Sequence, residues 1–486
     1  MADDRRPHAP EIEKSIPESR NVNIANPSMP IAEAPGLTYQ QLLDREDIDP
    51  PPPPVSRFHN PVDLGVEPIK ASRYTSREFF ELEVEKMWLK TWQYTCREEE
   101  IPNAGDTYVF DLVGRSVLIV RQQDGAIKAL QNVCRHRGRK LATHGGCKSR
   151  LRCPYHGLTW NIDGSFQHNP FAWDFPQVDE AAFGLPELRL ETWAGFIFIN
   201  FDADAAPLLG LLGAYPEHMD HFQIDDSYKA VHLGKVVNAN WKACAEAFLE
   251  SSHVIGTHPQ AASYAGYDQV QYDLISDHVT RFVVPMGVTS EVWTGPELSD
   301  EQKIRAALGN GSRGGPPGAA LAKPLREGQT MRNYLAEIAR ENLERDTGYD
   351  FSARSDGELL DGFSYDVFPN THIWGGFTVK ICYRIRPYGM DHERSLLEIF
   401  LMKIKPKGTN PAPAQYRLLG PDELLADAPE LGGSYLGGLL DQDVANLGPQ
   451  QDGLRALGPD GELTFGRYSD MRCRNLHRMI DDYLAR

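Results

Sequence analysis

Two short segments combine cysteine and histidine in a pattern that suits metal binding. The first reads Cys134-Arg135-His136, and the second, sixteen residues later, reads Cys153-Pro154-Tyr155-His156. Two thiolates and two imidazoles suit a [2Fe–2S] cluster with the cysteines on one iron and the histidines on the other. A structural zinc site can use the same four donors. Zinc fingers, however, place their cysteines in one segment and their histidines in another, whereas each segment here is mixed.

Each segment continues into glycine, Gly138 and Gly157, so that the backbone can turn tightly around a cluster. The two segments together resemble the Rieske motif. Rieske proteins of respiratory chains carry a second cysteine in each segment, and those two cysteines form a disulfide. Arg139 follows the first segment and Tyr155 lies inside the second, so that disulfide cannot form here. The resemblance therefore points to the soluble oxygenase type.

A second candidate site begins at Asn240-Trp241-Lys242 and ends at His258. Glu246, Glu250 and His253 are spaced i, i+4 and i+7, which predicts that one helix face presents all three. His258 is five residues beyond His253, about 140° round an ideal helix. Both imidazoles can meet one metal only if the helix ends or distorts between them, which Gly256 allows.

This stretch resembles the Asn-Trp-Lys…Glu-x-x-x-Asp/Glu-x-x-His-x-x-x-x-His-Pro signature of Rieske non-haem iron oxygenase α subunits. Two positions differ, since Ser252 stands where tyrosine is common and Glu250 where many members have aspartate. The resemblance implies that His253 and His258 bind a catalytic Fe(II), together with one carboxylate from far downstream.

In the family, that carboxylate lies ahead of a glutamine-bearing helix. Leu440-Asp441-Gln442-Asp443, followed by Gln450 and Gln451, matches this description, and we expect Asp443 to be the ligand. Asp441 is the rival, with a helix N-cap as its structural alternative. Asp361 and Asp366 are poorer candidates because they lie in a different context. Two histidines and one carboxylate would leave positions open for O2.

Composition limits the partners. A formal net charge of −18 argues against nucleic acid. Between Cys134 and Ile162, however, there are seven Lys or Arg and no Asp or Glu. These cations either brace the cluster loops or attract an acidic partner, for which a ferredoxin or a reductase is the natural candidate.

We expect a cytoplasmic protein with no membrane association. No apolar run approaches the roughly 18 residues of a membrane span, and the first residues lack the apolar core of a signal peptide. Seven cysteines fit a reducing compartment better than a disulfide framework.

The chain divides into three predicted parts. Residues 1–74 are a Pro-rich extension that either stays mobile or wraps a neighbouring subunit. Residues 75–213 form a Rieske domain with a leading helix, which Thr75-Ser76-Arg77-Glu78 opens as a capping box. Residues 214–486 form the catalytic domain. In the Rieske domain an alternating pattern predicts strands over Thr107–Leu112, Ser116–Arg121 and Ala126–Leu130, and Thr192–Phe201 is predicted as a strand buried on both faces.

The catalytic domain has both strands and helices, so the predicted fold class is α+β with a small antiparallel β domain and a large antiparallel sheet. Strands are expected over Val279–Met286, Gly376–Tyr388 and Leu396–Ile404. Helices over Asp300–Leu308 and Gln329–Asp346 flank the glycine-rich Gly309–Gly318, which either caps a substrate channel or decorates the surface. The resemblance implies the helix-grip fold.

The resemblance also implies a function. It is that of a terminal mono- or dioxygenase α subunit that takes electrons from NAD(P)H through a reductase, with or without a ferredoxin. It would hydroxylate, dihydroxylate or dealkylate an organic substrate, as in aromatic hydrocarbon catabolism. Cys134, Cys153, His136 and His156 would hold the cluster. Glu250 would bridge ligand histidines of two subunits in a homotrimer, with or without a β subunit. The alternative is a Rieske electron-transfer or redox-sensing protein without oxygenase activity.

Overall fold

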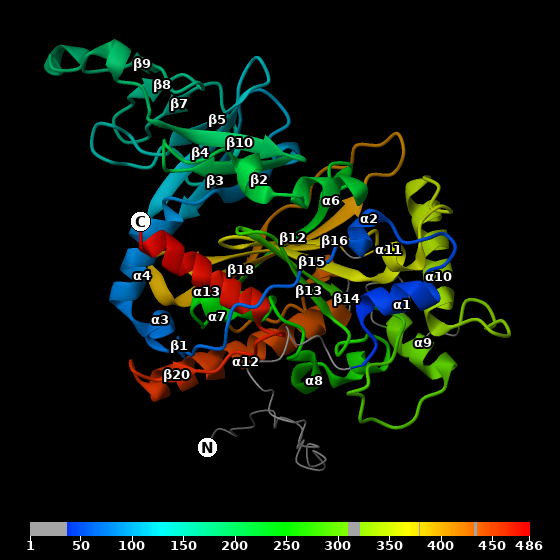
Figure 1. The fold of residues 1–486 in the computed structure, drawn as a ribbon. Coiled ribbons are helices and arrows are strands. Elements are labelled where there is room, and N and C mark those ends of the chain that lie inside the picture. The colour runs from blue at the N-terminus through cyan, green and yellow to red at the C-terminus, as the bar shows by residue number, and fades with distance from the viewer. Residues whose placement is uncertain (1–35, 310–320, 379, 432–434) are drawn as a thin grey trace, which may run out of the picture.

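The computed structural model describes residues 36–309, 321–378, 380–431 and 435–486 (Figure 1). A smaller β unit, which contains both Cys/His segments, lies at one end of the molecule, and a larger unit built on one long sheet makes up the rest. The predicted α+β class with a large antiparallel sheet is confirmed. None of the helices in the described ranges has both the length and the apolar character of a membrane span.

The smaller unit has a seven-stranded antiparallel sheet with a three-stranded sheet beside it. In spatial order the larger of the two contains β2 (Gln93–Arg97), β11 (Phe196–Asn200), β10 (Glu187–Trp193), β5 (Ile127–Gln131), β4 (Arg115–Arg121), β3 (Asp106–Leu112) and β6 (Gly146–Cys147). The smaller contains β7 (Leu151–Arg152), β8 (Thr159–Trp160) and β9 (Phe166–His168). The three strands predicted before the first segment are confirmed as β3, β4 and β5.

The single strand predicted over Thr192–Phe201 was wrong, because the chain reverses inside it. Ala194 and Gly195 have φ values of +48° and +78° and form the two-residue turn between β10 and β11. Positive φ at both central residues is the requirement of a type I′ hairpin turn, for which glycine is favoured. The segment was predicted as one strand buried on both faces because apolar and aromatic residues lie on both sides of the turn.

The larger unit is organised on an eight-stranded sheet. Its strands in spatial order are β13 (Gln271–Ser276), β14 (Val279–Val284), β15 (Gly362–Val367), β16 (Thr371–Gly375), β17 (Ile381–Tyr388), β18 (Asp391–Ile404), β12 (Ser227–Val237) and β19 (Arg417–Leu419). All neighbours are antiparallel except β12 and β19. The three strands predicted here are confirmed, although β17 begins at Ile381 and not at Gly376.

Helices cover this sheet and extend from it. They are α1 (Tyr39–Glu46), α2 (Pro54–Arg57), α3 (Ser72–Thr75), α4 (Arg77–Glu83) with a π-helical turn at Val84–Trp88, α5 (Leu208–Leu212), α6 (Tyr215–His221), α7 (Trp241–Glu246), α8 (Val254–Thr257), α9 (Asp300–Gly309), α10 (Met331–Thr347), α11 (Asp356–Leu360), α12 (Tyr435–Leu457) and α13 (Met471–Leu484). The two helices predicted over Asp300–Leu308 and Gln329–Asp346 are confirmed as α9 and α10. The predicted insertion Gly309–Gly318 lies, after Gly309, outside the described residues. The cap of α4 is Ser76, which accepts from Phe79 N, and not Thr75 as predicted.

The two faces of the large sheet have different neighbours. Cys382, Arg384 and Phe400 lie on the face that meets the smaller unit, where the Arg384 guanidinium donates to the backbone carbonyls of Tyr94 and Thr95. The opposite face is covered by α7, which packs on β17 and β18, and by α13, which packs on β14. The sheet is therefore buried on both sides.

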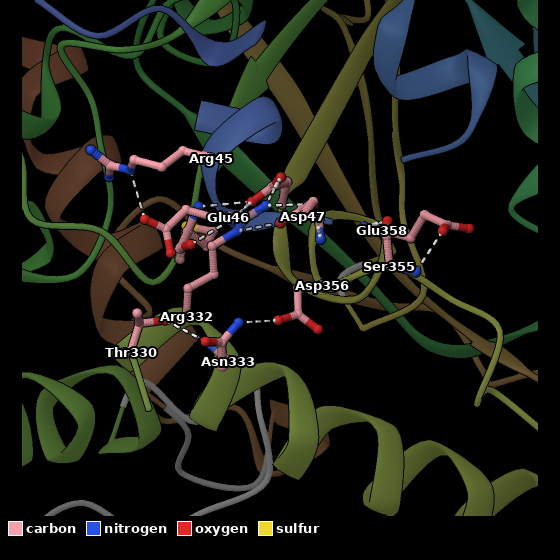
Figure 2. A network of polar contacts seen from close by, with 12 residues as sticks. Arg45, Glu46, Asp47, Thr330, Arg332, Asn333, Ser355, Asp356 and Glu358 are labelled. Carbon is pink, nitrogen blue, oxygen red and sulfur yellow. Dashed lines mark hydrogen bonds and ion pairs between the residues drawn. The ribbon is translucent and has the colours of Figure 1, made fainter. Parts of the chain in front are cut away.

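The N-terminal arm docks on its own chain. Asp47, just after α1, accepts from Arg332 of α10 at 3.0 Å, and Arg332 also pairs with Asp361 at 2.7 Å (Figure 2). A short strand, β1 (Ile69–Lys70), pairs with β20 (Glu462–Leu463) near the other end of the chain. The expectation that this arm stays mobile or wraps a neighbour was wrong for the described residues 36–74. The ion pair between Asp47 and Arg332 could not be predicted from the sequence.

We predict that Arg332→Met destabilises the fold by about 3–5 kcal/mol, because it leaves two carboxylates buried without their cation. The midpoint of urea unfolding measures this change. Arg345→Met, on the exposed side of the same helix, is the matched control and should shift stability by less than about 0.5 kcal/mol. Equal midpoints for the two variants would show that the arm is not held by this contact.

Candidate metal centres

The two Cys/His segments form loops of the same backbone geometry. In each loop the cysteine N–H donates to the carbonyl five residues further on, at 2.8 Å in both. The carbonyls of Cys134 and Cys153 accept from the N–H groups of Gly138 and Gly157 at 3.0 and 3.1 Å. Both glycines have positive φ, +75° and +81°, a conformation that most other residues adopt only under strain. The loops therefore present their side chains in equivalent ways.

The two cysteines of these loops lie beside each other, and so do the two histidines. Cys134 and Cys153 are buried and unpaired, and burial raises the pKa of the Cys134 thiol next to Cys153. The ring centroids of His136 and His156 lie 4.7 Å apart. His136 Nδ1 is buried and has no hydrogen-bond partner among the described residues. A pair of adjacent thiols and a pair of adjacent imidazoles, one with an unsatisfied nitrogen, fit the donor set of a [2Fe–2S] group.

The basic residues around these loops fall into two groups. Arg135 donates to the carbonyls of Ala182 and Gly184 at 2.7 and 2.9 Å and so braces the first loop. Arg150 is exposed and Lys148 is half-buried, and neither side chain makes a hydrogen bond or ion pair with the described part of the chain. Arg135 therefore braces a cluster loop, whereas the side chains of Lys148 and Arg150 are available to a binding partner.

The helix that carries Glu246 ends sooner than predicted. α7 stops at Glu246, whose carboxylate bonds to Tyr74 Oη at 2.7 Å and His477 Nε2 at 2.8 Å, so it does not share a helix face with Glu250 and His253. Glu250 accepts from the side chain of Ser252 and from His253 N at 3.0 Å. Such local side-chain bonds compete with helical backbone bonds. The helix break therefore precedes His253, and Gly256 lies inside α8.

Two histidines and one aspartate meet across the fold. His253 and His258 flank α8, and Asp443 projects from α12. One ligand atom from each of the three lies within 4.8 Å of the others. Asp443 Oδ1 is 2.7 Å from His258 Nε2 and 3.6 Å from His253 Nε2. Two imidazole nitrogens and one carboxylate oxygen can bind Fe(II) on one face of the ion, which leaves its other coordination positions open.

Each histidine is oriented through its other ring nitrogen. His253 Nδ1 lies 2.7 Å from Glu250 Oε1, and His258 Nδ1 lies 2.7 Å from Gln442 Oε1. Burial lowers the pKa of His253, but the hydrogen bond and charge of Glu250, with Asp443, raise it overall. Both Nε2 atoms are therefore directed at Asp443. Sequence reasoning missed Gln442, whose only signal was its place beside the candidate ligand.

The rival carboxylates are engaged elsewhere. Asp441 accepts from the backbone N–H groups of Leu425 and Ala426 at 2.8 and 2.9 Å, so it anchors a loop to α12 instead of capping a helix. Asp361 pairs with Arg332, and Asp366 is buried beside His372. Asp443 lies inside α12 and not ahead of it, so the expected place of the helix was wrong.

Comparisons with known proteins agree with both sites. Residues 91–179 match the model of the Rieske [2Fe-2S] domain, and residues 214–486 match that of the ring hydroxylating alpha subunit (catalytic domain). The carnitine monooxygenase oxygenase subunit of Escherichia coli (strain K12) is 33% identical over 214 residues, 42% of this chain and 54% of that one. The biphenyl 2,3-dioxygenase subunit alpha of Rhodococcus jostii (strain RHA1) is 34% identical over 191 residues, 38% of this chain and 41% of that one. The chain spans about half the length of these curated relatives.

Solved structures share the fold over most of the chain. A quaternary ammonium Rieske monooxygenase aligns with a TM-score of 0.61 at 20% identity, over 87% of this chain and 96% of that one. Naphthalene 1,2-dioxygenase with indole bound aligns with a TM-score of 0.60 at 19% identity, over 87% and 93%. The smaller and the larger unit therefore have the architecture of these proteins.

We predict that Asp443→Ala lowers the iron content from about three atoms per chain to about two, because it removes the carboxylate that we expect to bind the mononuclear iron. The visible absorption of the cluster should remain. Metal analysis and an absorption spectrum measure both quantities on one sample. Asp441→Asn is the matched control and should keep all its iron. The opposite pattern in the two variants would make Asp441 the ligand.

Proposed function

Because the chain belongs to the ring-hydroxylating α subunit family and carries a Rieske [2Fe–2S] domain, we propose that it is the terminal component of an O2-dependent oxygenase. It takes electrons from NAD(P)H through a reductase, with or without a ferredoxin, and hydroxylates, dihydroxylates or dealkylates an organic substrate. The convergence of His253, His258 and Asp443 carries this proposal. A Rieske protein that only transfers or senses electrons would need no such second site.

The chain's own residues have separate roles in this proposal. Cys134 and Cys153 hold one iron of the cluster, and His136 and His156 hold the other. His253, His258 and Asp443 hold a mononuclear Fe(II). When bound, the cluster supplies electrons one at a time and the Fe(II) activates O2. Glu250 and Gln442 keep the two imidazole rings in the orientation that directs Nε2 inward. We expect the protein in the cytoplasm, because seven cysteines fit a reducing compartment better than a disulfide framework.

The relatives have two kinds of substrate in their names, namely quaternary amines such as carnitine, choline and glycine betaine, and aromatic compounds such as biphenyl and chlorobenzene. The experiment that tests the proposal supplies both classes to the iron-loaded protein with a reductase. It measures NADH and O2 consumption together with product. Consumption without product for every compound, or no consumption at all, would refute the oxygenase function.

Assembly forms part of the proposal. We expect a homotrimer, with or without a β subunit, in which the cluster domain of one copy approaches the catalytic unit of the next. Glu250 Oε1 accepts from His253 in its own chain, and in the trimer its carboxylate would also accept from His156 of a neighbouring copy. Glu250 is buried enough for its charge to matter, with a side chain 13% exposed.

We predict that Glu250→Gln slows steady-state turnover about 10- to 100-fold, because the amide keeps the shape but loses the charge that orients the rings. Iron content, the cluster spectrum and the trimer, measured by light scattering, should be unchanged. Ser252→Ala removes a neighbouring contact of the same carboxylate and is the matched control. Wild-type turnover in Glu250→Gln would exclude the bridging role.

We predict that the double variant Lys148→Glu/Arg150→Glu slows reduction by the physiological donor and flattens its salt dependence. Both side chains are cations at the surface, half-buried for Lys148 and exposed for Arg150, and neither has a partner in the described chain. Stopped-flow reduction at several salt concentrations measures this effect. Reduction by dithionite is the control and should not change. Unaltered donor kinetics would place donor docking on another surface.

A further inference from the structure

One buried arginine of the catalytic unit lacks a counter-ion. Four arginine side chains are less than 2% exposed. Three of them make ion pairs at 2.5–2.7 Å: Arg281 with Asp273, Arg332 with Asp361 and Arg384 with Glu398. The fourth, Arg472 of α13, has no carboxylate oxygen of the described residues within 4.0 Å of its nitrogens. A buried cation without an anion is costly, so this exception calls for an explanation.

The surroundings of Arg472 leave one edge of its guanidinium free. Nε donates to Thr280 Oγ1 at 3.2 Å and Nη1 to Ser364 Oγ at 3.3 Å, while the group lies 4.6 Å from the centre of the Phe282 ring. Nη2 is buried and has no partner among the described residues. Burial lowers the pKa of Arg472 to about 10, whereas that of each paired arginine is raised. The direct contacts of the side chain are with neutral groups, and the charge of Asp366, whose oxygens lie more than 4.0 Å from the Arg472 nitrogens, only partly offsets the effect of burial on its pKa.

Other polar atoms on the sheet face that Arg472 contacts are also unsatisfied. Asn370, His372 and Trp374 are spaced two residues apart along the chain at β16, so their side chains share the sheet face that Ser364 occupies. Asn370 Nδ2, both ring nitrogens of His372 and Trp374 Nε1 are buried without a hydrogen-bond partner in the described chain. Buried polar groups are nearly always satisfied, so a cluster of this kind marks a place where a ligand or water belongs.

This face of the sheet lies under the segment that carries His253. Residues opposite one another in the register place His372 beside Tyr383 and Ser364 beside Trp374. Tyr383 stacks on Phe248, with ring centroids 4.4 Å apart. In the next row Tyr272, opposite Phe282, bonds through its hydroxyl to Ser251 Oγ at 3.0 Å. Each of these two rows of cross-strand neighbours therefore contacts the connection from α7 to His253. The unsatisfied atoms lie on the sheet face that meets this connection and α13.

Asp366 does not replace the missing counter-ion. It lies opposite His372, with Oδ1 3.3 Å from His372 Nδ1, and that oxygen makes no hydrogen bond. Burial raises the pKa of Asp366 to about 7 even with Arg472 lowering it. Near neutral pH the carboxyl is therefore only partly charged.

We propose that Arg472 binds a carboxylate of the organic substrate, with His372 and Trp374 able to donate further hydrogen bonds. The inference rests on the proposed function, since the substrate must reach the site of His253, His258 and Asp443. Phe282, Trp374 and Tyr383 offer aromatic walls for the rest of the molecule. The substrate class is thus an organic acid, and a zwitterion that carries a carboxylate satisfies the same contact.

Matched ligand pairs test this inference in the wild-type protein. Benzoate is compared with benzamide, and glycine betaine with choline, by anaerobic calorimetric titration of the iron-loaded protein. In at least one pair the acid should bind about 10- to 100-fold more tightly than its partner, the range expected for hydrogen bonds to a charged group. No preference for the acid in either pair, including no binding at all, would overturn the proposal.

Variants assign the preference to one side chain. Arg472→Met should abolish the acid preference, and Arg478→Met, on the exposed side of the same helix, should keep it. Without ligand, Arg472→Met should melt at the wild-type temperature or above it, because it removes an unpaired buried charge. A large fall in melting temperature would instead show that Arg472 has its counter-ion inside the fold and would overturn the proposal.

The two proposals fail in different ways. An acid preference that depends on Arg472, in a protein that consumes no O2 with any compound, would refute the oxygenase function and retain the carboxylate site. Turnover of neutral compounds without any acid preference would refute only the carboxylate site.

Discussion

The mononuclear site depends on one contact between distant parts of the chain. Asp443 Oδ1 lies 2.7 Å from His258 Nε2, although 185 residues separate the two in sequence. The two histidines flank α8, one before it and one after it, but α12 must dock before the carboxylate arrives. Gln451 of α12 secures that docking by accepting from the backbone N–H of Asn240, the cap of α7, at 2.8 Å. The site therefore cannot form from the local segment alone.

Buried ion pairs fix the elements that surround this contact. Lys242 of α7 and Glu83 of α4 pair at 2.7 Å with both side chains fully buried, which ties the leading helix of the smaller unit to the helix before the histidines. Arg384 joins β17 to Glu398 of β18 and to carbonyls of β2. Such pairs offset a large desolvation cost only when their geometry is good, so they disfavour alternative packings more than they add stability. Arg472 differs from them because no carboxylate oxygen of the described residues lies within 4.0 Å of its nitrogens.

Features that depend on residue type and spacing within a short segment could be predicted from the sequence. The Cys/His segments, their glycines and the strands β3 to β5 follow from residue type and spacing. The end of α7 at Glu246 was missed, because the bonds from Glu250 to Ser252 and His253 compete with a helix that the spacing favours. Gln442, the dual pairing of Arg332 and the isolation of Arg472 depend on which distant segments pack together. A single sequence contains no signal for those contacts.

The two histidines are oriented by residues from different parts of the fold, so the site is assembled from two separate segments of the chain. Glu250 orients His253 within the same loop, whereas Gln442 reaches His258 from α12. Successive helical residues point about 100° apart, so Asp441, Gln442 and Asp443 face three ways. The first anchors the loop at Leu425 and Ala426, the second orients His258, and the third offers its carboxylate. A shift of α12 by one residue would change all three contacts at once while leaving the bond from Glu250 to His253 intact. The position of α12 therefore controls whether the donor set is complete.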